Sequence, residues 1–562
     1  MDDVRAVVPR AGSVTDEIDV ASRGSAPAGR GQAPIRVISN RRVPPDGGLG
    51  ERGGAVELSI HDDVMGTGSG GVEAGGRANL RRELGRLDTV LFLISAMVVV
   101  DTIGAISIGG PQVFTWLVVL CLTFFVPSAL ATAELGAALP DEGGAYVWVR
   151  RAFGRRAGAL TSLLYWAGTP IWIGGSIAVV AIAVVESFIA PMSGVGRVLF
   201  GLAFVGVATV GAVVPLKHGK WIPGSGAVTQ IVLLVFFTAT VALSGIRHGV
   251  HGLALGELMP TRGVFIAVVP VLMYSFVGVE LPSAAAQEMR DPRRDVPAAI
   301  LRAGIAQALM YGVPILAILV VLPADRLTSL NGFVDALRLV LTEYGGTVSP
   351  EGTARLAGPG AVLGWVSAVA FVWVLVASGT TWLMGTARTQ ACACLDGAGP
   401  RVLGRISPTT GVPVVMALVS GAASAAMLVV GLAATGADVQ RYFTVALTGA
   451  IAFIMLAFLL IYPSFAVLRR RLPTLPRPFR VPGGPVTAWL ITAAATVWTL
   501  LATVCLLWPG AGTAHPDERL PAGFEGRRWQ FEALVGAPIA AVLVAFGVHL
   551  VWQQWRDRPR GI

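Results

Sequence analysis

Apolar segments of about 20 residues, each long enough to cross a bilayer as a helix, recur along the chain from Thr89 to Gln553. Most contain glycine or proline, which membrane bundles tolerate because neighbouring helices satisfy the freed backbone groups. The pattern predicts an all-α integral membrane protein with about twelve transmembrane helices. The predicted spans are 89–109, 113–134, 158–182, 197–215, 222–244, 263–287, 302–322, 361–387, 413–433, 442–468, 486–508 and 532–553.

Residues 1–80 have a different character. They are rich in glycine, proline and charged residues and contain no long apolar run. Such a segment cannot bury enough apolar surface to offset its ordering entropy, so it is predicted to be a disordered cytoplasmic tail. A partner-binding role for it stays open. A twelve-helix membrane domain is expected over 85–555, followed by a short cytoplasmic tail, 554–562.

Composition and charge support the membrane assignment. Hydrophobic residues make up 54% of the 562 residues and charged residues only 14%, which excludes a soluble multidomain enzyme. With a cytoplasmic N-terminus, the inner loops and C-terminal tail hold 21 Lys and Arg residues and the outer loops ten, not counting twelve in the N-terminal segment. The positive-inside rule then places both termini in the cytoplasm of a multi-pass cell-membrane protein. The net charge of +9 therefore indicates topology and predicts no nucleic-acid partner.

No cofactor, metal or catalytic site is predicted. The four cysteines are too scattered for a disulfide framework, and the Cys392–Cys394 pair has no further ligands near it in the sequence. The six histidines form no metal-binding spacing, and no nucleophile–base constellation supports a membrane enzyme.

The first and sixth spans are predicted to be interrupted helices. The first carries Asp101 and Gly104 in its middle, and the sixth carries Gly278 and Glu280 between two prolines. These spans open two blocks of five, which fits an inverted repeat (89–244 and 263–468) followed by helices 11 and 12 (486–553). A carboxylate at membrane depth is costly, so both are candidate functional groups, with a structural hydrogen bond between helices as the alternative.

An interrupted helix also leaves backbone N–H and carbonyl groups free to bind a ligand. We expect free N–H groups near Gly104, Ala105 and Ile106 to bind a carboxylate, and free carbonyls near Val99 and Val100 to bind an ammonium group. Such a site suits a zwitterion. Trp166, Trp172, Ser378 and Thr381 either line the pathway or pack between helices, and the residues leave both readings open.

Four stretches resemble the amino acid–polyamine–organocation (APC) transporters, in particular the arginine/agmatine and glutamate/GABA antiporter branches. The stretches are Ala133–Gly154 (AELGAALPDEGGAYVWVRRAFG), Tyr274–Ile300 (YSFVGVELPSAAAQEMRDPRRDVPAAI), Arg388–Pro400 (RTQACACLDGAGP) and Arg477–Gly483 (RPFRVPG). The resemblance implies a LeuT-like fold of two five-helix repeats in which helices 1, 3, 6 and 8 line the substrate pathway. It also implies that Tyr274 covers the substrate and that Glu280 is the helix-6 carboxylate.

The expected substrate-binding set is Asp101, Thr102, Gly104, Ala105, Ile106, Tyr274, Ser275, Gly278 and Glu280. The chain departs from the family in helix 1, where Asp101–Ala105 replaces a glycine-rich pattern, and in helix 5, where residues 230–243 lack the lysine of proton-coupled relatives.

The sequence therefore predicts a secondary active transporter, a permease or exchanger, that moves amino acids or related amines by alternating access. A polyamine or organic-cation transporter and an amino-acid-binding sensor without transport are the alternatives. The expected partners are the small-molecule substrate, the lipid bilayer and a second copy in a homodimer.

Overall fold

The computed structural model describes residues 84–98, 101–107, 109–250, 255–321, 332–349, 353–436, 438–511, 513, 515–521 and 523–556. The chain divides after Glu73 into two units, and the described residues all belong to the second. The predicted disordered tail, residues 1–80, and most of the predicted C-terminal tail lie outside the described residues.

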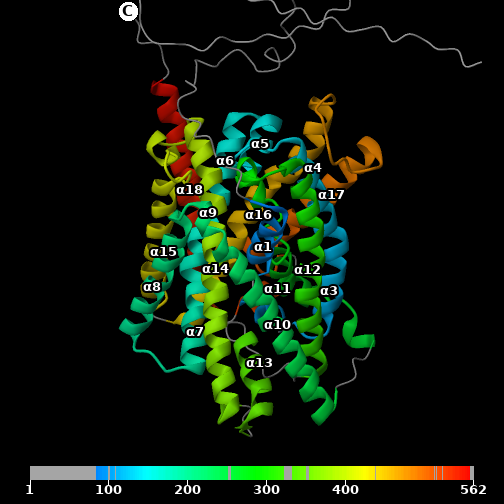
Figure 1. Ribbon diagram of the computed structural model, residues 1–562, viewed down its shortest axis with the longest axis vertical. Coiled ribbons are helices and arrows are strands. Elements are labelled where there is room, and N and C mark those ends of the chain that lie inside the picture. Colours follow the sequence, from blue (N-terminus) through cyan, green and yellow to red (C-terminus); the bar gives the residue numbers. More distant parts are fainter. Residues whose placement is uncertain are drawn as a thin grey trace, which may run out of the picture. The chain divides into compact units, whose positions relative to one another are not determined.

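Ten helices in this part of the chain are long and apolar enough to cross a membrane. They lie side by side in a bundle, with helix α5 at one end and α13 at the other (Figure 1). Seven of the ten are single α-helices: α8 (Gly194–Val213), α12 (Pro292–Val321), α14 (Pro359–Leu395), α15 (Val414–Ala434), α16 (Val439–Arg471), α17 (Gly484–Leu507) and α18 (Arg528–Arg556).

Three of the ten are composite. Gln112–Ala138 joins α3 (Gln112–Leu120), the π-turn η1 (Cys121–Phe125) and α4 (Val126–Ala138). Arg155–Phe188 joins α6 (Arg155–Trp172), the π-turn η2 (Ile173–Ile177) and α7 (Ala178–Phe188). The third joins α9 (Leu216–Gly219) and α10 (Trp221–His248). The turn η2 brings backbones close: a Cβ on Gly174 would lie 2.1 Å from the Ser424 carbonyl oxygen of α15.

The two remaining predicted spans are each split, as expected. The first forms α1 (Arg86–Met97) and α2 (Asp101–Ser107), and the sixth forms α11 (Arg262–Tyr274) and a 3₁₀ segment, η4 (Leu281–Glu288). The mostly helical fold and the interruptions are therefore confirmed, whereas the twelve-helix count and the inverted repeat stay predictions.

Some helices extend beyond their predicted limits. Helix α14 continues to Leu395, whereas the apolar pattern predicted its end near residue 387. The prediction stopped where Arg388 begins a polar stretch. The helix continues because the Arg388 guanidinium, 2% exposed, pairs with Glu288 and so is accommodated inside the bundle.

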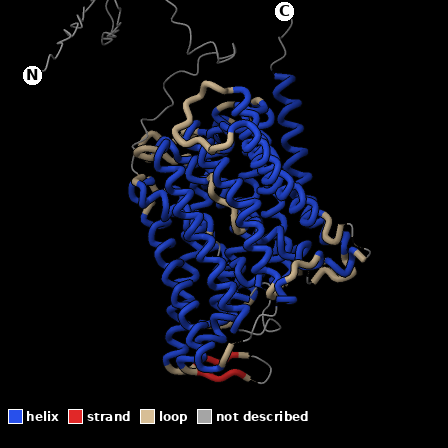
Figure 2. The backbone as a smooth tube through the Cα atoms, turned by 90° about the vertical axis from the view of Figure 1, so that its right-hand side faces the viewer, coloured by secondary structure: helices blue, strands red, loops and turns tan. Residues whose placement is uncertain are grey.

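The remaining elements lie in the connections. They are α5 (Ala145–Phe153), η3 (Leu255–Leu258), α13 (Gly332–Leu341), η6 (Thr342–Tyr344), strands β1 (Gly346–Val348) and β2 (Ala354–Leu356), η7 (Arg401–Gly404) and η8 (Pro516–Arg519). The two strands pair antiparallel, Thr347 opposite Arg355, in the hairpin drawn in red in Figure 2. Helix α13 buries Phe333, Leu337, Val340 and Leu341, the face that the 3.6-residue period predicts.

Candidate functional site

The end of α1 exposes backbone carbonyls that side chains from three other helices bind. The indole Nε1 of Trp382 (α14) donates to the Ala96 carbonyl at 2.9 Å. The amide of Gln307 (α12) donates to the Met97 carbonyl at 3.5 Å, and the amide of Gln230 (α10) donates to the Val98 carbonyl. These carbonyls are acceptors that a continuous helix would have satisfied itself. The next two carbonyls, which were expected to bind an ammonium group, lie outside the described residues.

The second half of the first span begins with α2 at Asp101. The expected backbone donors, Gly104, Ala105 and Ile106, therefore lie within α2, after its first three residues. The structure does not describe the side chains of Asp101, Gly104 and Ala105. Ile106 is fully buried.

Thr102 connects this half-helix to its neighbours. Its hydroxyl lies 3.1 Å from the Tyr311 hydroxyl of α12 and 3.3 Å from the Ser275 hydroxyl at the end of α11. All three side chains are completely buried. The expected residues Thr102 and Ser275 are therefore in contact, although they lie 173 positions apart in the sequence.

The sixth span is interrupted between Tyr274 and Leu281. The backbone turns here through single hydrogen bonds, including Val277 N–H to the Tyr274 carbonyl at 3.0 Å. Gly278 has a φ of +111°, a conformation that side chains rarely adopt, and a Cβ there would lie 3.3 Å from Met97 Cγ. The glycine therefore permits both the turn and the close contact between the two interrupted spans.

Glu280 lies at this turn and is 3% exposed. Tyr165 (α6) donates a hydrogen bond of 2.6 Å to its Oε1, and the Gly278 N–H donates to its Oε2 at 3.3 Å. Among the described residues, no lysine or arginine forms an ion pair with Glu280. A buried carboxylate in such surroundings needs a proton or a cationic ligand to neutralise it.

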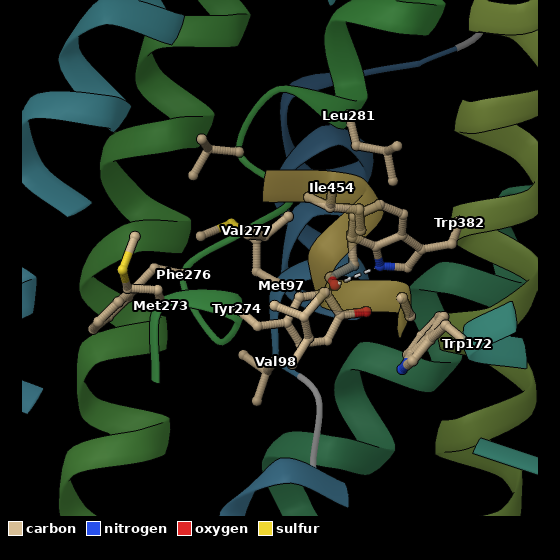
Figure 3. Close-up of a cluster of buried hydrophobic side chains, with 14 of the residues drawn as sticks. Met97, Val98, Trp172, Met273, Tyr274, Phe276, Val277, Leu281, Trp382 and Ile454 are labelled. Atoms are coloured by element: carbon tan, nitrogen blue, oxygen red, sulfur yellow. Dashed lines mark hydrogen bonds between the residues drawn. The ribbon is translucent and has the colours of Figure 1, made fainter. Parts of the chain in front are cut away.

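Aromatic rings extend from Glu280 to the end of α1. The Tyr165 ring centroid lies 6.1 Å from that of Trp382, and the Trp382 ring lies 5.9 Å from Trp172. Figure 3 shows Met97, Tyr274, Trp172 and Trp382 gathered around the two interruptions. The Trp172 Nε1 and the Ser378 Oγ are buried and have no hydrogen-bond partner among the described residues. They are polar atoms available to a ligand.

The other two pathway candidates make helix contacts. Trp166 donates through Nε1 to the Ser420 hydroxyl of α15 at 2.8 Å. Thr381 lies 3.1 Å from the Ser95 hydroxyl of α1 and donates to the Ala377 carbonyl. These contacts favour packing roles for both residues.

Sequence reasoning missed five residues at the site: Tyr165, Gln230, Gln307, Tyr311 and Trp382. A signal existed for two of them. Tyr165 lies seven residues before Trp172 and Trp382 four residues after Ser378, so each shares a helix face with a residue that the sequence did indicate. The glutamines gave no such signal, because a single amide in an apolar span does not reveal which carbonyl it binds.

An ion cluster lies at the α5 end of α14, outside the apolar segment. Arg388 Nε donates to Glu288 at 2.8 Å, and its Nη2 has no hydrogen-bond partner among the described residues. Glu142, in the loop after α4, lies near both. Burial raises the pKa of the Glu142 carboxyl to about 7, with a smaller upward contribution from Glu288 and an opposing one from Arg388.

A family model for amino acid permeases matches residues 84–520, which cover the whole site. The chain belongs to this family. The resemblance to APC transporters is thereby confirmed, and the permease is a multi-pass membrane protein with a small-molecule substrate.

Two curated relatives of the permease match over most of its length. The probable agmatine/putrescine antiporter AguD of Lactococcus lactis is 26% identical over 412 residues, which are 72% of this chain and 84% of the relative. The branched-chain amino acid permease BcaP of Bacillus subtilis is 26% identical over 463 residues, 77% of this chain and 90% of the relative.

Solved structures support the fold of the permease. A point mutant of the manganese transporter of Eremococcus coleocola superposes with a TM-score of 0.54 over 83% of this chain and 93% of the transporter. Sequence identity is 14%, so this likeness concerns the fold alone.

Proposed function

We propose that the protein is a secondary transporter that moves amino acids or related amines across the cytoplasmic membrane by alternating access at the two interrupted spans. One observation carries the substrate class: Glu280 is a buried carboxylate beside both interruptions, without a basic partner among the described residues. The ammonium group of a substrate supplies the missing charge. Family membership supports transport over catalysis, and we infer that the protein converts no substrate chemically.

Two buried polar atoms without a partner among the described residues, Trp172 Nε1 and Ser378 Oγ, suit the other end of a zwitterion. An indole N–H only donates, so Trp172 Nε1 pairs with an acceptor such as a carboxylate oxygen. The Ser378 hydroxyl can join it. In this proposal Glu280 and Asp101 attract the ammonium group, Tyr274 covers the substrate, and Thr102 and Ser275 connect the two interruptions around it.

A polyamine or organic-cation substrate is the second candidate. The relative from Lactococcus lactis is named as a probable agmatine/putrescine antiporter, and such amines carry donors alone. They would use the carboxylates and leave Trp172 without a partner. An amino-acid-binding sensor without transport is the third candidate. Substrate uptake by a chain that lacks residues 1–80 would exclude the sensor, because a transporter does not need the tail for uptake.

The test is exchange by the purified full chain in proteoliposomes. Counterflow is measured with a set of α-amino acids, their decarboxylated amines, diamines and simple dicarboxylates. We expect α-amino acids to exchange and dicarboxylates not to. Glu280→Gln should weaken binding of every cationic substrate, whereas Trp172→Phe should weaken binding of α-amino acids more than of diamines. Exchange of diamines alone, unaffected by Trp172→Phe, would favour the polyamine reading.

We also infer that both termini face the cytoplasm and that the protein functions in the cell membrane. The excess of Lys and Arg in alternate loops supports this orientation. A homodimer stays a prediction.

A further inference from the structure

Helix α12 contacts both interrupted spans through two polar residues one turn apart. Gln307 and Tyr311 are both fully buried and lie four positions apart, so they project from the same face of the helix.

Gln307 binds both interruptions with one nitrogen. Its Nε2 donates to the Ser275 carbonyl, at the end of α11, and more weakly to the Met97 carbonyl, at the end of α1, 3.5 Å away. Both partners are carbonyls that only accept, so the amide must present its NH₂ group to them, and its two hydrogens match the two acceptors.

Tyr311 joins a second connection, on the α2 side of the interruption. Its hydroxyl contacts Thr102 of α2, which contacts the Ser275 hydroxyl. At the other end of these spans, the Leu84 N–H donates to the Glu288 carbonyl at 3.0 Å, and the Arg290 N–H donates to the Leu84 carbonyl at 3.1 Å. The first and sixth spans are thus connected before, at and after their interruptions, and the middle connection depends on one amide.

We propose that Gln307 is a positioning residue for transport, which holds the two interruptions in register by donating to Met97 and Ser275 together. The proposal rests on the proposed function, because register matters only if both interruptions surround the substrate. Gln307 touches no substrate in this account. Its loss leaves two buried carbonyls without a donor among the residues that the structure describes, and it weakens the connection between the two halves of the site.

Gln307→Glu tests the donation directly. A protonated glutamic acid can donate to a carbonyl, but an ionised carboxylate places negative charge against two carbonyl oxygens. Burial raises the pKa of such a carboxyl by up to roughly 3–5 units, so the pH range must extend to about 10. In proteoliposomes, the ratio of variant to wild-type exchange turnover should be near one third or higher at about pH 5 and fall at least about tenfold by about pH 10. Substrate affinity should change less than turnover. Gln307→Leu has the same bulk and no donor, so its turnover should be low at both pH values.

Gln390→Glu is the matched control. Gln390 is also a buried glutamine, but its oxygen accepts from Ser162, a bond that a carboxylate keeps, and its nitrogen contacts only the Cys394 sulfur at 3.7 Å. The ratio of Gln390→Glu turnover to wild-type turnover should therefore stay constant over the same pH range, unlike the ratio for Gln307→Glu. If Gln307→Glu fails to reach the membrane, Gln307→Leu serves as the test, and its turnover should be at least several-fold below that of wild type.

A turnover ratio for Gln307→Glu that does not change with pH, whether near one or uniformly low, overturns the proposal. Wild-type turnover in Gln307→Leu overturns it as well. These results differ from failure of the proposed function, in which the wild-type chain itself exchanges no amino acid or amine.

Discussion

Tyr274 is the last residue of α11, directly before the interruption of the sixth span, and it is 2% exposed. Its ring lies with Trp172 and Trp382 beside the end of α1 (Figure 3). If the ring covers the substrate, Tyr274→Ala should lower substrate affinity by about tenfold, and Tyr274→Phe by no more than about threefold, because the ring supplies most of the contact. Binding is measured by thermal shift with the substrate found in the exchange assay. Equal affinity in the alanine variant and the wild type would exclude this role.

Glu142 makes the stability of the protein depend on pH. Its pKa is about 7 in the folded protein, above its ordinary value of 4.5. The folded state therefore holds this proton more tightly than the unfolded state does. The free energy of unfolding falls by at most about 3 kcal/mol as pH rises from about 4.5 to about 7, and above that this group has no further effect. Glu142→Gln stays neutral, so its melting temperature should equal that of wild type at pH 5 and exceed it at pH 8.

The adjacent Asp141 provides the control for Glu142. Asp141 pairs with Arg151 at 2.7 Å, and both side chains are substantially exposed, 43% and 39%. Such pairs contribute little, so Asp141→Asn should change the melting temperature slightly and equally at both pH values. If Glu142→Gln also changes the melting temperature equally at both pH values, the Glu142 carboxyl is ionised in the folded protein at both, and its pKa is not raised.

At the scale of elements, Glu134 joins α4 to the end of α16 and the loop that follows it. It is 1% exposed, and it pairs with Arg469 and with Arg477, whose Nε lies 3.1 Å away. The Val481 N–H also donates to it at 2.8 Å. Glu134→Gln leaves two guanidinium groups without a counter-charge, which should cost about 3–5 kcal/mol and lower the melting temperature or the yield of folded protein.

Glu186 is the corresponding control for Glu134. It pairs with Arg197 at 2.8 Å, but the two side chains are 21% and 35% exposed. Because water screens this pair, Glu186→Gln should cost about 1 kcal/mol or less. Equal losses in the two variants would mean that the Glu134 cluster does not hold these elements together.

The elements were largely predictable from the sequence, and the side-chain contacts of the site were not. Hydropathy identifies the spans because bilayer thickness fixes their length, and Gly278 beside Glu280 marked an interruption. The interruption itself depends on Gln230, Gln307 and Trp382, whose donors satisfy carbonyls on α1 from three other helices. Those partners follow from packing across the bundle, which no local pattern encodes.

At the scale of the whole molecule, the orientation of the chain in the membrane decides which end of the bundle faces the cytoplasm. The Arg388–Glu288 pair and Glu142 lie on the same side as α5, whereas the β1–β2 hairpin lies at the opposite end of the bundle (Figures 1 and 2). In the proposed orientation, which rests on the excess of Lys and Arg in alternate loops, the α5 side lies in the cytoplasm. This orientation predicts that the ion cluster faces the cytoplasm and that the hairpin faces outward.

Thiol labelling in intact cells tests this orientation, after the four native cysteines, Cys121, Cys392, Cys394 and Cys505, are replaced by serine. The positions must be exposed: Ala152 in α5 is fully buried and would not label from either side. Thr347 in the hairpin and Arg156 at the start of α6 are exposed. A membrane-impermeant maleimide should label Thr347→Cys in intact cells, and Arg156→Cys only after permeabilisation. The reverse pattern would show that the basic loops face outward and that the positive-inside argument fails for this protein.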